Sequence, residues 1–400
     1  MQLKNLKKAD EKADNIFRIP TPYDLISHFS PDNQQNKRKV IFWGASFMKL
    51  SDELRVDDYI HKANECLDYI RRECANCDLY YKPHPAEKDE SKLLDLTSFK
   101  ILEDPTLAEI FLWKNLNQIS HSFSISSNAS VAAYNFGLNS YVFYKLFEPA
   151  VGKATFEAWR DYFKNLPDQI SITDLNMSLE ENRILLSNNE LLKQNIRKLL
   201  EENSGKIWFT IVEPSPVMIM VALAELIKSI EPERQIGLII SQQRRWRVIG
   251  MDDFRDYFDE IRFLPRVYYS LRPRKIWTAV LQAIKIRNFK IKSEDIIISF
   301  MAFPNFSFVE NCLISYFKKN KKITFCYPMN FDTMYALNFS DFFKQADFKT
   351  KPASVFFNKI LEPMLGLFRT VYLQCGDGRV FNITRYNKPL ENIFDQVYLT

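Results

Sequence analysis

Glycine is scarce in this sequence, with only nine residues among 400. Neither a G-x-G-x-x-G run nor a G-x-x-x-x-G-K-[ST] run occurs. These runs bring backbone N–H groups close to the phosphates of dinucleotides and nucleoside triphosphates, so the commonest fingerprints of both ligand classes are excluded. Asp-x-Asp is absent as well, which disfavours a nucleotide diphosphate held through a metal ion. We therefore expect no metal and no other cofactor.

Histidine is also rare. It occurs only at His28, His61, His84 and His121, so the second half of the chain offers no imidazole as a catalytic base or metal ligand. Long apolar runs are missing too: no stretch reaches the roughly 18 apolar residues of a membrane span, and the opening residues lack the apolar core of a secretory signal. We expect a cytoplasmic protein whose six cysteines are reduced thiols.

The composition is that of a globular protein, with 46% hydrophobic and 26% charged residues. Its length suits two domains with sizeable cores. We divide the chain into a polar N-terminal arm (1–37), a first domain (38–176), a helical linker (177–205) and a second domain (206–400). A formal net charge of +5 favours no nucleic-acid partner.

Apolar runs of strand length alternate with segments of helical periodicity in both domains. This alternation predicts the α/β class, with parallel sheets covered by helices on both faces and two Rossmann-like domains. The predicted strands lie at 39–44, 78–82, 99–102, 118–125 and 140–144 in the first domain, and at 207–212, 236–241, 295–300, 322–326 and 370–375 in the second. The predicted helices lie at 56–74, 106–115 and 128–136, and then at 216–230, 309–319 and 355–368.

Two short motifs end strands of the first domain. The stretch Tyr-Tyr-Lys-Pro-His-Pro-Ala-Glu (80–87) places His84 and Pro85 after one strand, and Ser126 and Ser127 close another strand and open a helix. Ligands bind at the carboxyl ends of strands in open α/β sheets, and a helix start offers N–H groups and a positive dipole end to an anion. The motifs therefore predict a phosphate site.

These motifs resemble those of the bacterial sialyltransferases and polysialyltransferases of the two-domain GT-B type, whose donor domain carries an HP motif and a downstream SS or ST motif. The resemblance implies that His84 contacts or protonates the departing phosphate of a CMP-sugar donor, that Pro85 belongs to the same donor site, and that Ser126 and Ser127 hydrogen-bond the phosphate oxygens. Glu109 would hold the donor ribose, although Thr106-x-x-Glu109 is equally a capping box that needs no ligand. Gly44 would lie where the opening loop approaches the nucleotide, with a plain tight turn as the alternative.

The family's catalytic base lies in its other domain, in an acidic-acidic-Gly motif. The segment Gly376-Asp377-Gly378 is similar to it and makes Asp377 the candidate base, although Asp-Gly is also a common turn. The first acidic position is Gly376 here, and the two domains follow one another in inverted order. A circular permutation, a fusion of two transferases, or a site completed by a second copy would each account for that order.

The resemblance implies a metal-independent, inverting transfer of sialic acid from CMP-sialic acid to a glycan acceptor of a bacterial capsule polysaccharide or lipooligosaccharide. Another CMP-keto-sugar such as Kdo, or an inactive protein that only binds nucleotide or glycan, are the alternatives.

One further stretch carries charge of a single sign. Residues 271–293 contain seven basic residues and no acidic residue, interleaved with Ile276, Trp277, Val280, Leu281 and Ile284. This pattern is typical of a basic amphipathic helix that makes a peripheral contact with the inner membrane surface or binds an acidic glycan. The alternative is a helix whose basic face is solvated and whose apolar stripe packs against the core.

Overall fold

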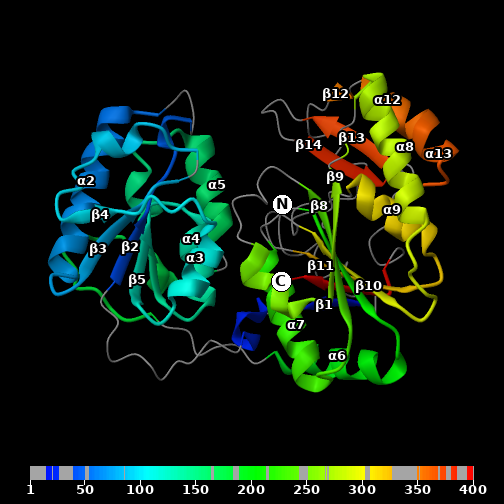
Figure 1. Cartoon of the computed structure of the whole chain (residues 1–400). Helices are drawn as coiled ribbons and strands as arrows, with labels where there is room; N and C mark the ends of the chain where they lie inside the picture. The colour runs from blue at the N-terminus through cyan, green and yellow to red at the C-terminus, as the bar shows by residue number, and fades with distance from the viewer. Residues whose placement is uncertain are drawn as a thin grey trace. The chain divides into compact units, whose positions relative to one another are not determined.

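The computed structural model describes residues 15–19, 21–26, 39–49, 54–84, 86–163, 166–182, 189–212, 216–242, 251–265, 267, 270–301, 307–326, 349–350, 352–367, 370–374, 380–384 and 394–399. The chain divides into two compact units (Figure 1). Unit 1 comprises Met1–Ile26 and Asn189–Thr400, and unit 2 comprises Ser27–Asn188. Unit 2 is thus inserted between two segments of unit 1.

Unit 2 is built on a five-stranded parallel sheet. Its strands are β2 (Lys39–Trp43), β3 (Asp78–Lys82), β4 (Phe99–Ile101), β5 (Ile119–Ser124) and β6 (Asn139–Val142). They lie in the order β4-β3-β2-β5-β6, and every neighbouring pair is parallel. Numbered within the unit, this order is 3-2-1-4-5, the order of a Rossmann sheet, and it reverses between β2 and β5.

Helices cover both faces of this sheet because its strands are apolar on both sides. On one face α2 (Val56–Glu73) packs Tyr59, Ala63 and Ile70 against Phe42 and Tyr81. On the other face lie α3 (Ala108–Asn115) and α4 (Asn128–Asn135), which pack against each other. The remaining elements of unit 2 are η3 (Phe47–Lys49), η4 (Glu90–Leu93), η5 (Tyr144–Phe147), α5 (Lys153–Phe163) and η6 (Asp168–Ile170).

Unit 1 has a second, larger parallel sheet. Its strands are β1 (Ile16–Arg18), β7 (Ile207–Ile211), β8 (Ile236–Gln242), β9 (Glu260–Pro265), β10 (Ile296–Met301), β11 (Lys321–Cys326) and β15 (Gln396–Leu399). Their order is β1-β15-β11-β10-β7-β8-β9, with all neighbours parallel. From β9 to β15 this is again the Rossmann order, 3-2-1-4-5-6, with β1 added at the edge.

The two faces of the second sheet carry different helices. One face is covered by α7 (Val217–Ile230), which contacts η1 (Pro22–Leu25), α6 (Glu190–Glu202) and η8 (Met251–Tyr257). The other is covered by α8 (Pro273–Arg287) and α9 (Phe308–Tyr316), whose apolar sides share one core with Trp208, Phe357 and Leu361. Beside them lie α12 (Pro352–Phe356), the π-helical turn η9 (Phe357–Leu361) and α13 (Glu362–Met364).

A small antiparallel sheet completes unit 1. It consists of β12 (Lys349–Thr350), β13 (Thr370–Gln374) and β14 (Val380–Thr384). The sequence placed strand 370–375 in an α/β alternation, but its neighbours in the structure are antiparallel.

The predicted arm and linker take part in the units. Within residues 1–37, β1 pairs with β15, and Tyr23 and Ile26 are buried in unit 1. Within residues 177–205, Asn182 donates from its side chain to the carbonyl of Ser140 in unit 2, whereas α6 packs on α7 in unit 1. Short strands and polar termini have weak local patterns, so their long-range pairing was not visible in the sequence.

Candidate functional site

Lys82, Trp43 and Ser124 form one row across the carboxyl end of the sheet in unit 2. Trp43 pairs with Lys82 in β3 and with Ser124 in β5. Adjacent strands lie about 4.8 Å apart, so the three strand ends and the loops that follow them are neighbours. Because the strand order reverses between β2 and β5, this edge is the point at which α/β sheets bind ligands.

Gly44 follows β2 directly, and its missing side chain leaves room for two groups from β3 and the next loop. A Cβ atom at Gly44 would lie 2.5 Å from Oε2 of Glu87 and 2.5 Å from the hydroxyl oxygen of Tyr81. The Tyr81 hydroxyl donates a 2.8 Å hydrogen bond to Oε1 of Glu87. The N–H of Gly44 donates to the carbonyl of Lys82 at 2.9 Å. Gly44 therefore holds the loops after β2 and β3 in contact.

His84 is exposed at the end of β3, and the loop fixes its ring orientation. Its backbone N–H donates to Oε2 of Glu87 at 3.0 Å, and the N–H of Ala86 donates to the Nδ1 atom of His84 at 3.1 Å. Since Nδ1 accepts a hydrogen bond, the neutral ring carries its proton on Nε2. In this tautomer the Nε2–H group is the hydrogen-bond donor of the His84 ring.

Glu87 is half-buried beneath this loop. Burial raises the pKa of its carboxyl, against the opposing effect of the hydrogen bonds donated by His84 and Tyr81. Desolvation favours the neutral form of a carboxylic acid, and donated hydrogen bonds favour the ionised form. The protonation state of Glu87 is therefore coupled to the position of the His84 backbone.

Glu90 ties the same loop to the loop after β2. It is only 4% exposed, and its Oε2 accepts from the N–H groups of Lys88 (2.7 Å) and Asp89 (3.1 Å). The Ser46 hydroxyl donates to the carbonyl of Ala86 at 3.2 Å and lies 3.3 Å from Oε1 of Glu90. Burial alone would raise the pKa of Glu90, but the donated hydrogen bonds bring it below its usual value of 4.5.

Ser127 is the N-cap residue of α4. Its Oγ accepts a 3.2 Å hydrogen bond from the N–H of Ala129, which satisfies one of the unpaired donors at a helix start. Ser126 is half-buried, and its hydroxyl has no hydrogen-bond partner within the described part of the chain. Both hydroxyls lie beside the first turn of α4, whose dipole favours an anion.

Buried serines fix the turn from β5 into α4. The N–H of Ser127 donates to Oγ of Ser124 at 3.0 Å, and the Ser130 hydroxyl donates to the same oxygen at 2.8 Å. Ser140 in β6 donates from its hydroxyl to the carbonyl of Ser130 at 2.7 Å. Ser124, Ser130 and Ser140 are almost fully buried, so these hydrogen bonds are shielded from water. They fix the Ser126-Ser127 turn to the ends of β5 and β6.

Glu109 lies in the first turn of α3, on the helix that enters from the end of β4. The capping-box alternative is wrong: Leu107 is the N-cap residue, and the Thr106 hydroxyl donates to Asp104 instead. Glu109 is half-buried, and burial raises the pKa of its carboxyl. The buried Lys82 donates from Nζ to the carbonyl of Asp104, which fixes the chain between β4 and α3.

Two expected site residues, Pro85 and Asp377, lie outside the described residues. Residues 375–379 connect β13 to β14, which pair antiparallel from Thr370 and Thr384 to Gln374 and Val380. Asp377 stays a prediction from the resemblance.

The structure thus brings Gly44 into contact with the His84 loop and sets Ser126 and Ser127 at the next strand end. Sequence reasoning assigned no role to Tyr81, Glu87 or Glu90, which hold these loops. The position of Glu87, three residues after His84, was the available signal, because a side chain at that spacing can accept the N–H of the first residue.

Neither a protein-family model nor a curated protein matches the sequence. The resemblance to sialyltransferases therefore depends on the motif residues alone. Among the described helices, none combines the length and apolar character needed to cross a bilayer. The described residues contain no group of three or more His, Cys, Asp and Glu side chains placed to bind one metal ion.

Proposed function

We propose that this chain is a glycosyltransferase that binds a CMP-sugar at the carboxyl edge of the sheet in unit 2. The observation that supports the proposal best is the convergence of three loops, those of Gly44, His84 and Ser126-Ser127, on one row of strand ends at the switch point. Nucleotides bind at this place in sheets of the same order.

The leaving group in this proposal is a nucleotide monophosphate. When the bond between the sugar and the phosphate oxygen breaks, the phosphate gains negative charge. The Nε2–H of His84, the hydroxyls of Ser126 and Ser127 and the positive end of the α4 dipole would then stabilise that charge. Glu109 would accept hydrogen bonds from the ribose hydroxyls.

The donor we propose is CMP-sialic acid, and the acceptor is a surface glycan. Asp377 is our candidate for the base that takes the proton from the acceptor hydroxyl. Its assignment depends on the resemblance of Gly376-Asp377-Gly378 to the acidic motif of the family. The same phosphate-binding groups would accept CMP-Kdo, because both donors carry one phosphate.

Release of CMP from CMP-sialic acid tests this function. The full chain should release CMP, and release should fall at least about 100-fold in His84→Ala and in Asp377→Asn. His61→Ala, at an exposed position of α2, is the matched control and should leave the rate unchanged. Faster release from CMP-Kdo would identify that sugar as the donor. Binding of CMP without release from either donor would contradict a transferase.

A further inference from the structure

Three large apolar side chains of α8 face solvent. Trp277 is 61% exposed, and Leu281 and Ile284 are each 48% exposed. Their spacing of four and then three residues places them in one row along the helix. The opposite face of α8 is buried and consists of Ala279, Ala283 and Ile286, with the neighbouring Gln282. The packed-stripe alternative therefore does not explain the apolar row.

Basic side chains border this row. Arg274, Lys285 and Arg287 lie three or four residues from Trp277, Leu281 and Ile284, and all three are exposed. Within the described residues, none of these cations forms an ion pair. An exposed apolar row edged by uncompensated positive charge is typical of helices that lie in the plane of an anionic membrane surface.

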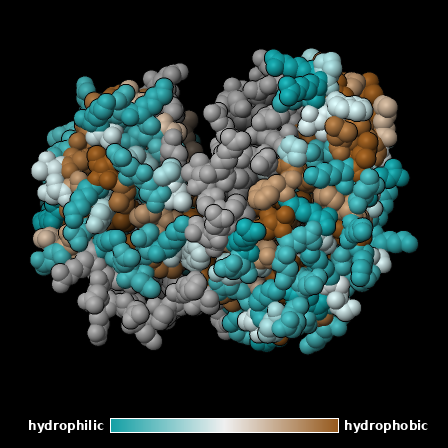
Figure 2. Space-filling model, in the orientation of Figure 1, coloured by the Kyte–Doolittle hydropathy of each residue, from teal (hydrophilic) through white to brown (hydrophobic). Residues whose placement is uncertain are grey.

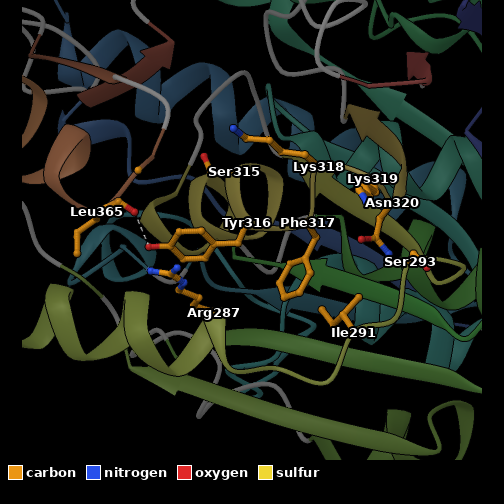
Figure 3. Close-up of a pocket in the computed structure, with 11 residues that line it drawn as sticks. Arg287, Ile291, Ser293, Ser315, Tyr316, Phe317, Lys318, Lys319, Asn320 and Leu365 are labelled. Carbon is orange, nitrogen blue, oxygen red and sulfur yellow. Dashed lines mark hydrogen bonds between the residues drawn. The ribbon is translucent and has the colours of Figure 1, made fainter.

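A pocket of 660 Å³ begins where α8 ends. Arg287, Ser293, Lys318, Lys319, Leu365 and Gly366 line it, and no ion pair within the described part of the chain involves its three cations (Figure 3). Tyr316 borders Arg287 and donates a 2.9 Å hydrogen bond to the carbonyl of Leu365. Three cationic side chains thus line this pocket.

The far side of the pocket carries more exposed apolar surface. Met364 precedes Leu365 and is 77% exposed, and Ile360, one turn earlier, is 48% exposed. Figure 2 shows hydrophobic surface gathered over the region where Figure 1 labels α8, α12 and α13. Apolar rows on two elements thus border one basic pocket.

We propose that these rows and the pocket form a docking face for an anionic phospholipid surface. Trp277, Leu281, Ile284, Ile360 and Met364 would enter the interfacial layer, and Arg287, Lys318 and Lys319 would contact lipid phosphates. Basic residues at helix C-termini are also favoured by the helix dipole, so charge alone does not carry the proposal. The stronger argument is the exposed apolar rows, because insertion into a lipid interface would remove these side chains from water.

A second copy of the chain fits this face less well. A symmetric contact would bring the same basic side chains together, and like charges at an interface repel. A lipid surface provides both the apolar layer and the opposite charge. This inference does not depend on the transferase activity.

Sedimentation of the full chain with vesicles tests the docking face. Vesicles of phosphatidylglycerol mixed with phosphatidylcholine should bind the chain, and vesicles of phosphatidylcholine alone should bind it at least tenfold more weakly. Each basic side chain near an anionic surface contributes about fivefold in affinity, so Arg287→Glu with Lys319→Glu should lower binding at least about 25-fold. Trp277→Ser with Leu281→Ser should lower it about tenfold or more.

The controls lie on α6 of the same unit. Arg197→Glu with Lys198→Glu matches the charge change, and Leu191→Ser removes an exposed leucine (46% exposed) away from the face. Both should bind as the parent chain does. Equal binding to both vesicle types, or equal losses in the control and test variants, would overturn the proposal. Tight binding to soluble polyphosphate that is unchanged in Trp277→Ser would also overturn it. So would a dimer, detected by sedimentation velocity, that Trp277→Ser dissociates.

Discussion

The hydroxyl of Tyr81 lies 2.8 Å from Oε1 of Glu87, and the pair fills the space next to Gly44. Tyr81 in β3, Glu87 in the loop that follows it and Gly44 at the end of β2 therefore pack against one another. The other Glu87 oxygen accepts the N–H of His84, so the same contacts hold the candidate phosphate ligand.

Gly44→Ala tests this arrangement. The added Cβ would lie 2.5 Å from both Glu87 and Tyr81, so the loops must move apart. We expect a loss of about 1–3 kcal/mol in the free energy of unfolding, together with weaker CMP binding. Gly366→Ala is the control: its φ of 69° strains an alanine, but no atom lies within 4 Å of the new Cβ, so CMP binding should persist. Unchanged CMP affinity in Gly44→Ala would contradict the coupling.

Substitutions of Ser126 and Ser127 should differ in their effects on stability and CMP binding. Ser127→Ala removes the cap of α4 and should cost about 1 kcal/mol of stability, whereas Ser127→Thr keeps an acceptor and should restore most of it. Ser126→Ala should change stability by less than about 0.5 kcal/mol and still weaken CMP binding. Denaturant unfolding and CMP titration measure the two effects. A stability loss at Ser126 as large as that at Ser127 would show that Ser126 is a structural residue.

The ring of His84 provides a third test. His84→Gln retains a side-chain N–H donor near the position of Nε2, and His84→Ala does not. We expect CMP binding to fall about tenfold or more in His84→Ala and to recover in part in His84→Gln. Equal losses in the two variants would show that donation from Nε2 is not what the site uses.

Glu87 should make stability depend on pH. Because burial raises its pKa in the fold, the folded state retains a proton that the unfolded state releases near 4.5. The stability that Glu87 contributes is therefore complete below pH 4.5 and is lost as the pH rises through its folded pKa. Thermal unfolding across this range should show a smaller decline in Glu87→Gln than in the parent chain, because the carboxyl of Glu109, whose pKa is also raised by burial, keeps its own contribution. Glu103→Gln, at an exposed position, should keep the decline.

Much of unit 2 could be predicted from local patterns. Strand β3 has the predicted bounds because Leu79 and Tyr81 alternate with outward residues and Pro83 ends the run. The role of Gly44 could not be predicted, since its neighbours Tyr81 and Glu87 come from another strand end. Thr106 satisfied a capping-box pattern, but Asp104 accepts hydrogen bonds from both its backbone N–H (2.8 Å) and its hydroxyl. That N–H is the donor that Glu109 would accept in a capping box.

Other features could not be predicted because they depend on contacts between segments far apart in the sequence. β1 has only three residues, and its pairing with β15 joins segments about 380 positions apart, which no window of sequence reveals. In α8 the periodicity indicated an amphipathic helix, but the alanines at 279 and 283 face the core while Trp277 faces solvent. Ile276 and Val280 of the predicted apolar stripe do pack against the core, so the pattern alone did not separate the packed residues from the exposed ones.

The most direct test of the central claim is calorimetric titration of the full chain with CMP. We predict one site per chain in the parent protein, with affinity at least tenfold weaker in the double variant His84→Ala, Ser126→Ala and unchanged in His61→Ala. Absence of CMP binding by the parent chain, or equal affinity in the double variant, would contradict a nucleotide site at this edge of unit 2.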